Sequence, residues 1–317
     1  MPTNNSHEGS GNSLGPVVCV DFGGSAIRTC VESDGAFLAT RVAEIAAGKE
    51  LETVAELVTQ MLDETGLVPA AISVAVPGVV DFSTQSLLRA HEKYRSLDGV
   101  NLKDWFHRKW NLPFALENDA RSALLGEVTS GVAAGAQNAV MVILGTGIGT
   151  AALVDGKIVR GHSGHGGILG GHISVDFEGK DCSCGNRGCA ESLASTWALT
   201  RDLEAKYSGD FRNIQALVTG SQQNDPQASA ILEQFIAIWA TTIVSLCHLF
   251  DPETVIVSGG PMRSAEHILP TLSKTVASRL WSSLVPPKVL VPQDPEMSVF
   301  RGLAQLGLLS VRKGYRQ

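Results

Sequence analysis

Three cysteines and one histidine lie close together near the middle of the chain. Cys182, Cys184 and Cys189 follow the pattern C-x-C-G-x-x-G-C-x-E, and His172 lies ten residues before the first of them. The intervening residues are polar and rich in glycine, which predicts a tight loop and not a helix face. Three thiolates and one imidazole are the ligands of a closed tetrahedral Zn²⁺ site.

The alternatives to a metal site are a disulfide or three unrelated thiols. A disulfide would leave one of the three cysteines over, and nothing in the sequence indicates an oxidising compartment. The remaining cysteines, Cys19, Cys30 and Cys247, lie in apolar runs and are expected to be inert core residues. The pattern therefore favours a structural zinc that fixes the loop.

Two glycine-rich turns predict phosphate binding. The first, Asp21-Phe22-Gly23-Gly24-Ser25, ends an expected strand, and glycine there lets backbone N–H groups approach a phosphate. Asp21 could hold Mg²⁺ through water, although this motif alone fits a tight hairpin equally well. The second turn runs from 144 to 150. It is neither a dinucleotide motif nor a Walker A loop, because a strand follows it and the G-K-[ST] element is missing. Two such turns facing one another across a cleft would form a phosphate clamp, made of Gly23, Gly24, Ser25, Gly145, Thr146 and Gly147.

Acidic residues at two expected helix starts each have two interpretations. Asp119, which follows Asn118 between a strand and a helix, is either the helix N-cap or a base that accepts a hydroxyl proton. The helix N-terminus would favour its ionised form, so a catalytic Asp119 need not be strongly basic. Glu191, two residues after the last thiol, either caps a helix or accepts a hydrogen bond from a sugar hydroxyl.

The elements that position these residues follow from hydrophobic patterning. A strand, a glycine turn and a second strand occur twice, beginning at Pro16 and at Ala139. This duplication predicts two related α/β halves facing a cleft, whereas a single doubly wound domain would need one glycine turn. We expect strands at 16–22, 27–32, 71–76, 114–117, 139–144, 150–154, 157–160 and 254–258, and helices at 51–65, 101–110 and 120–131.

Composition excludes several classes of protein. The 317 residues carry a formal charge of −7, and no basic run indicates a nucleic-acid surface. Residues 1–15 are small and polar, which predicts a disordered leader and not a signal peptide. The apolar segment 231–250 contains six polar side chains, so we expect a buried core helix and not a membrane span. These features together predict a cytoplasmic protein with reduced cysteines, bound neither to nucleic acid nor to a membrane.

Seven motifs together resemble the ROK family (repressor, ORF, kinase) of sugar kinases. The motifs are DFGGSAIR at 21–28, PGVVD at 77–81, ENDA at 117–120, LGTGIG at 144–149, GGHI at 170–173, CSCGNRGCAES at 182–192 and DPETVIVSGG at 251–260. The resemblance implies the actin-like ATPase (ribonuclease H-like) fold, with two α/β domains around a cleft. It places a small domain at 16–118 plus 300–317, with a C-terminal helix from about Phe300, and a large domain with the zinc loop at 119–299.

The resemblance also implies roles for single residues. Asp119 would be the general base for the 6-hydroxyl of a sugar, and Asn118 would bind neighbouring hydroxyls. His172, also a zinc ligand, and Glu191 would contact the C1–C2 side of the sugar, with Gly78 and Leu169 in the same site. ATP, with Mg²⁺, would lie on the glycine turns and near Gly259 and Gly260. Family resemblance further suggests a homodimer or homotetramer.

Leu169 departs from the pattern of the family. The family usually shows E-x-G-H, in which the glutamate hydrogen-bonds the sugar, whereas this chain has L-G-G-H. A leucine cannot accept that hydrogen bond, and an unpaired buried hydroxyl costs about 1–3 kcal/mol. We therefore expect a sugar that lacks or modifies the hydroxyl facing Leu169, or a weak and broad hexose kinase.

The predicted function is ATP-dependent phosphorylation of a hexose, or a hexose derivative, at its 6-hydroxyl. The alternative is a non-catalytic, sugar-sensing or regulatory member of the same family. Repressors of the family carry an N-terminal helix-turn-helix, and only about twenty residues precede Asp21 here. A non-catalytic relic would not need Asp119 and both phosphate turns, so the kinase is the favoured hypothesis.

Overall fold

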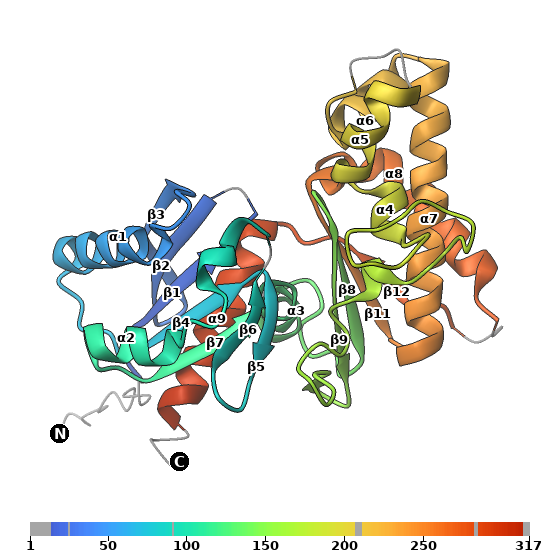
Figure 1. Ribbon diagram of the computed structural model, residues 1–317. Helices are drawn as coiled ribbons and strands as arrows, with labels where there is room; N and C mark the ends of the chain where they lie inside the picture. Colours follow the sequence, from blue (N-terminus) through green and yellow to red (C-terminus); the bar gives the residue numbers. More distant parts are fainter. Residues whose placement is uncertain (1–13, 25, 91, 207–210, 282–284, 313–317) are drawn as a thin grey trace, which may run out of the picture.

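The computed structural model describes residues 14–24, 26–90, 92–206, 211–281 and 285–312. These residues form two halves, each built on a five-stranded mixed sheet (Figure 1). Nearly all of the predicted leader, residues 1–13, and Ser25 of the first glycine turn lie outside the described residues.

The two sheets have the same strand order and the same directions. In the first sheet the order is β3-β2-β1-β4-β7, and in the second it is β10-β9-β8-β11-β12. Each sheet has three antiparallel strands followed by two that run parallel to its central strand. The predicted duplication is therefore confirmed, and the alternative of a single doubly wound domain is wrong.

The strands are β1 (Val17–Phe22), β2 (Ala26–Ser33), β3 (Ala36–Glu44), β4 (Ala71–Val76), β7 (Phe114–Asn118), β8 (Ala139–Leu144), β9 (Ile148–Val154), β10 (Lys157–Ile158), β11 (Thr254–Gly259) and β12 (Lys288–Leu290), with a separate hairpin of β5 (Gly78–Asp81) and β6 (Ser86–Ala90).

Helices cover both faces of the sheets, and their ends follow local sequence signals. Helix α2 starts after Asn101, whose side chain accepts from the backbone N–H of Asp104, and ends at Asn111 in the left-handed conformation. Helix α1 ends in the same way at Gly66, as its sequence predicts. The helices are α1 (Glu50–Thr65), α2 (Leu102–Trp110), α3 (Asp119–Ser130), α4 (Ala190–Ala194), α5 (Thr196–Lys206), α6 (Ile214–Gln222), α7 (Pro226–Phe250), α8 (Ala265–Arg279) and α9 (Pro295–Arg312), with 3₁₀ turns η1 (Glu92–Leu97), η2 (Gly170–His172) and η3 (Gly260–Ser264).

Helix α7 is the one described helix long and apolar enough to cross a membrane by length and composition. More than half of its apolar stretch is buried inside the protein, where it forms the centre of the second half. Trp239 is almost fully buried, and its indole N–H donates to the carbonyl of Ala194 at 2.8 Å. This packing agrees with the predicted core helix.

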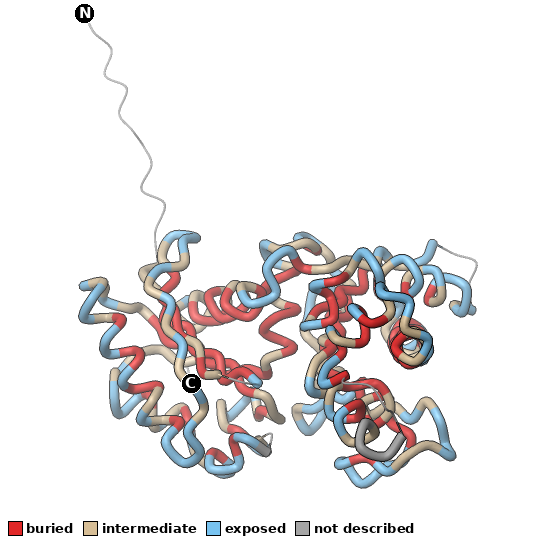
Figure 2. The backbone as a smooth tube through the Cα atoms, turned by 90° about the horizontal axis from the view of Figure 1, so that it is seen from above, coloured by how far each residue is buried: buried red, intermediate tan, exposed pale blue. Residues whose placement is uncertain are grey.

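Helices α3 and α9 lie between the two sheets. Alternate residues of β1 point to opposite faces, so Val18 and Val20 pack with α1, whereas Val17 and Cys19 pack with α9. One core cluster therefore contains residues of both sheets and of both helices, and Figure 2 shows buried residues throughout the interior of each half. Helix α9 begins at Pro295, five residues before the expected start.

The crossing of α3 and α9 depends on two glycines. A Cβ added to Gly126 would lie 2.0 Å from the carbonyl oxygen of Ser298, and one added to Gly302 would lie 1.9 Å from that of Ser122. Real Cβ atoms do not approach oxygen this closely, so the two backbones could not keep this distance with any other residue at either position.

We predict that Gly302→Ala destabilises the protein by about 1–3 kcal/mol, because the backbones of α3 and α9 must separate. The measurement is the midpoint of thermal or urea unfolding. The matched control is Gly149→Ala in β9, where an added Cβ would meet its neighbours at 3.8 Å, an ordinary contact distance. Equal stability of the two variants would show that the close crossing is not required.

Candidate active site and metal centre

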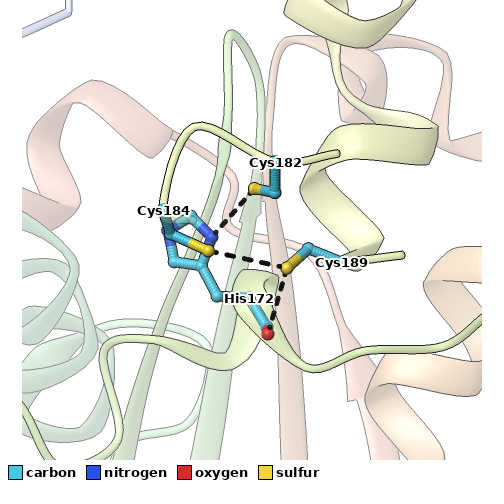
Figure 3. A group of neighbouring side chains, drawn as sticks. All are labelled: His172, Cys182, Cys184 and Cys189. Atoms are coloured by element: carbon cyan, nitrogen blue, oxygen red, sulfur yellow. Dashed lines mark hydrogen bonds between the residues drawn. The ribbon is translucent and has the colours of Figure 1, made fainter. Parts of the chain in front are cut away.

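The predicted zinc ligands come together in one loop between η2 and α4 (Figure 3). One ligand atom from each of His172, Cys182, Cys184 and Cys189 lies within 4.8 Å of every other. The loop is fixed by its own backbone, since Cys182 donates its N–H to the carbonyl of Asn186 at 2.8 Å. The local sequence folds in this way because its glycines allow close backbone approach and left-handed conformations.

The distances in this cluster fit zinc and exclude a disulfide. Zinc–sulfur bonds of about 2.3 Å and zinc–nitrogen bonds of about 2.0 Å, at tetrahedral angles, place two sulfurs about 3.8 Å apart and a sulfur and a nitrogen about 3.5 Å apart. Cys184 Sγ lies 3.7 Å from Cys189 Sγ, and Cys182 Sγ lies 3.6 Å from His172 Nδ1. A disulfide would need about 2.05 Å. His172 would thus bind zinc through Nδ1, leaving Nε2 for another partner.

Glu191 lies beside Nε2, between the metal loop and the second glycine turn. Its Oε1 lies 3.9 Å from Nε2 of His172, and its Oε2 accepts the backbone N–H of Ile148 at 2.8 Å. Glu191 lies in the first turn of α4, but its carboxylate holds the β8–β9 turn instead of capping that helix. The predicted contact with a sugar stays a prediction.

The first glycine turn is held on both sides. Gly23 donates its N–H to the carbonyl of Ala26 at 3.0 Å, and its own carbonyl accepts the hydroxyl of Tyr94 at 2.6 Å. Asp21 is buried at the end of β1, where its Oδ2 accepts two N–H bonds from Arg28 at 2.7 and 3.1 Å. Burial raises the pKa of Asp21, and the charge of Arg28 opposes that rise.

The second glycine turn is anchored by the start of α5. Thr196 and Trp197 donate their backbone N–H groups to the carbonyls of Gly145 and Thr146, at 3.0 and 3.1 Å. The turn itself closes with a bond from Gly145 N–H to the carbonyl of Gly147, also at 3.0 Å.

The glycines predicted to bind ATP divide into two groups. At two positions, packing alone explains why the residue is glycine. A Cβ on Gly147 would lie 2.4 Å from Glu191 Oε2, and one on Gly259 would lie 1.9 Å from the carbonyl oxygen of Leu144. Among the described residues, and apart from each glycine's chain neighbours, no heavy atom would lie within 4 Å of a Cβ on Gly24, Gly145 or Gly260. Open space at these three positions is what a backbone that approaches a phosphate or nucleotide requires.

Asn118, and not Asp119, is the N-cap of α3. The side-chain oxygen of Asn118 accepts the N–H of Arg121 at 3.2 Å, and its amide donates to Oδ1 of Asp119 and to the carbonyl of Gly78. The interpretation of Asp119 as a simple helix cap is therefore wrong. Gly78 must be glycine here, since a Cβ would lie 2.2 Å from the carbonyl oxygen of Arg89.

The carboxyl group of Asp119 is more basic than its place at a helix N-terminus suggests. Burial, reinforced by the negative charge of Asp21, raises the pKa of Asp119 to about 7. Hydrogen bonds from Asn118 and from the N–H of Ala120 oppose this rise without cancelling it. The helix N-terminus is expected to favour the ionised form, but desolvation is the larger effect on the pKa of Asp119.

Sequence patterns did not reveal the charged residues that surround these turns. Arg28 contacts Asp21, and Glu117 forms ion pairs with Arg121 and Arg160 beneath the Asn118–Asp119 turn. Only the position of Arg121, four residues after Glu117 at a helix start, gives a local signal for its ion pair.

Leu169 lies just before η2 and is 43% exposed, so packing in the core does not explain why a leucine occupies this position.

We predict that Cys184→Ser lowers the zinc content of the purified protein well below one per chain, because a tetrahedral site loses one of its four ligands. Elemental analysis checks the stoichiometry. Cys247→Ser, which alters a buried thiol outside the cluster, is the control and should retain zinc. Equal zinc content in both variants would remove Cys184 from the ligand set.

Comparison with known proteins identifies the family of this fold and site. A xylose repressor from Bacillus subtilis is 29% identical over 95% of this chain and 77% of its own length. A glucokinase from Thermotoga maritima is 29% identical over 85% of this chain and 89% of its own length. The crystal structure of a ROK family glucokinase from Streptomyces griseus, in complex with glucose and AMPPNP, matches with a TM-score of 0.78 at 27% identity and covers 95% of this chain and 100% of that one. The sequence pattern of the ROK family matches residues 17–307, and the chain therefore belongs to the ROK family.

Proposed function

We propose that this protein is a sugar kinase, which transfers a phosphoryl group from ATP to the 6-hydroxyl of a hexose or hexose derivative. The observation that carries this proposal is the half-buried Asp119, whose pKa is raised to about 7 at the start of α3. A general base works best when its pKa lies near the working pH. Its neighbour Asn118 offers an amide that would orient the sugar.

The remaining parts of the site suit phosphoryl transfer, which needs positioning and electrostatic stabilisation more than covalent chemistry. Gly24 and Gly145 leave open space on the side where a Cβ would lie, which would let a phosphate approach the backbone. Asp21, at the end of β1, would hold Mg²⁺ bound to the nucleotide, and the bound ion would neutralise charge on the phosphates. Closure of the two halves would exclude water and align the sugar hydroxyl with the phosphate.

Zinc would act on structure and not on the reaction itself. It would fix the loop that carries His172 and would orient Nε2 toward the sugar and Glu191.

We extend the proposal to a cytoplasmic homodimer or homotetramer, with a large domain at 119–299 and the rest of the described chain in the small domain. The Streptomyces relative binds glucose and AMPPNP, which supports ATP and a hexose as substrates. Leu169 would select a sugar that lacks or modifies the hydroxyl facing it.

The second candidate is a sugar-sensing regulator, because a xylose repressor is among the relatives. A sensor and a kinase both need a sugar site and a closing motion. A sensor has no use for a carboxyl group with a pKa near neutrality, whose partial desolvation destabilises the ionised form. Asp119 therefore favours the kinase.

We predict turnover in a coupled ADP-release assay with ATP and Mg²⁺ against hexoses, ketohexoses and N-acetylhexosamines. Asp119→Asn should bind the same sugar but lose transfer by about 10²–10⁴-fold, because the amide cannot accept the proton. The control is Asp63→Asn, an exposed acid on α1. Near wild-type turnover of Asp119→Asn would refute the assignment of the base. Sugar binding without turnover by the wild-type protein would favour the sensor.

The reaction should also depend on pH in a defined direction. Asp119 accepts a proton only when ionised, and its pKa in the free protein is about 7. We therefore predict that kcat/KM for the sugar falls as the pH decreases below about 7, approaching tenfold per unit. A profile that stays flat from pH 8 to pH 5 would contradict a base of this pKa.

A further inference from the structure

A cluster of three charged residues lies directly beneath the Asn118–Asp119 turn. Glu117 and Arg121 are each only 1% exposed, and the side chain of Arg160 is 25% exposed. Glu117 lies on β7 and Arg121 on α3, whereas Arg160 follows β10 of the second sheet. Charged groups are buried in this way only when they are paired.

The carboxylate of Glu117 connects the backbone of the turn to both guanidinium groups. Its Oε1 accepts the N–H of Asn118 at 2.9 Å and lies 3.5 Å from Nη1 of Arg121. Its Oε2 forms an ion pair with Nη2 of Arg160. The position of Asn118 is therefore coupled, through one carboxylate, to a residue from the other half of the protein.

The loop that carries Arg160 lies on the first half of the protein over several residues. Nη2 of Arg121 donates to the carbonyl of Gly166 at 2.6 Å. The guanidinium of Arg160 lies 3.9 Å from the centre of the Phe82 ring, next to β5. Gly164 packs so closely on β5 that an added Cβ would lie 2.4 Å from the carbonyl oxygen of Val80. In Figure 1, β5, β6 and α3 lie on the side of the first half that faces the second sheet.

The same loop continues into the metal centre. The hydroxyl of Thr150 donates to the carbonyl of Gly167 at 2.7 Å and accepts the N–H of Gly170 at 2.8 Å. Gly170 begins η2, which ends at the zinc ligand His172. Residues 160–172 therefore connect the turn of the proposed base to the metal loop.

Resting on the proposed function, we propose that Arg160 is a positioning residue that assembles the sugar site from both halves. Its ion pair with Glu117 holds residues 160–168 against the Asn118–Asp119 turn, so that Asn118 and Asp119 face His172 and Glu191 across the sugar. Nε of Arg160 is buried without a hydrogen-bond partner, so its contact with Glu117 rests on the outer nitrogens of the guanidinium. A lysine at this position could therefore replace part of the interaction.

The test compares Arg160→Ala, Arg160→Lys and Arg108→Ala, the last being an exposed arginine on α2. In Arg160→Ala we expect the KM for the sugar to rise about tenfold or more, because small displacements in a site are costly. The KM for ATP and the zinc content should stay unchanged. Arg160→Lys should recover part of the loss, and Arg108→Ala should match the wild type. An unchanged sugar KM, or equal rises in both KM values, would overturn the proposal.

A second measurement separates this inference from the proposed activity. Hydrogen exchange followed by mass spectrometry reports on peptides 114–121 and 160–168 whether or not the protein turns over any sugar. Arg160→Ala should speed exchange in both peptides and leave the α7 peptide 231–247 unchanged. If the wild-type protein has no kinase activity, this pattern still decides whether Arg160 holds the loop to the turn. Unaltered exchange in both peptides would show that it does not.

Discussion

The position of Asp21 and Asp119 depends on the close crossing of α3 and α9. Gly126 and Gly302 let the two backbones approach, and Glu127 fixes the crossing from inside. The carboxylate of Glu127 accepts the hydroxyl of Ser298 at 2.6 Å and the N–H of Val132 at 2.8 Å, and lies 3.5 Å from Arg301. These partners compensate the cost of burying the carboxylate. Because α3 begins at Asp119 and α9 packs on β1, which carries Asp21, the crossing contributes to the position of both acids.

Asp21 is buried and Asp119 is half-buried, and the two acids differ in their partners. Asp21 has a guanidinium in direct contact, which opposes the rise in its pKa that burial causes. Asp119 has amide and backbone donors instead, and it also experiences the negative charge of Asp21. Desolvation raises the pKa of both carboxyl groups, and only Asp21 has a guanidinium that opposes the rise. This difference, and not burial alone, supports distinct roles for the two carboxylates.

Local patterns predicted eight of the twelve described strands, missing β3, β5, β6 and β12, and they predicted the metal ligands, which lie near one another in the sequence. Strand 71–76 and strand 139–144 are observed with the predicted bounds, and the spacing of Cys182 and Cys184 already required convergence of their sulfurs. Glu117 and Arg160 are 43 residues apart in the sequence, so the periodicity of hydrophobic residues, which is local, does not predict their ion pair. For the same reason the carboxylate of Glu191 could not be assigned to the β8–β9 turn, which lies 43 residues earlier. The pKa of Asp119 depends on desolvation, which no sequence motif encodes.

The metal loop is linked to two other parts of the proposed site. His172 lies beside Glu191, whose carboxylate accepts the N–H of Ile148 in the second glycine turn. Residues 160–172 link the same loop to Glu117, which lies beneath the turn of Asp119. A structural metal placed between them would order both the phosphate side and the sugar side of the site at once. A kinase and a sensor could share this arrangement, because both must couple sugar binding to a change between the two halves. They would differ at Asp119, where only phosphoryl transfer requires a group that takes up a proton near neutral pH.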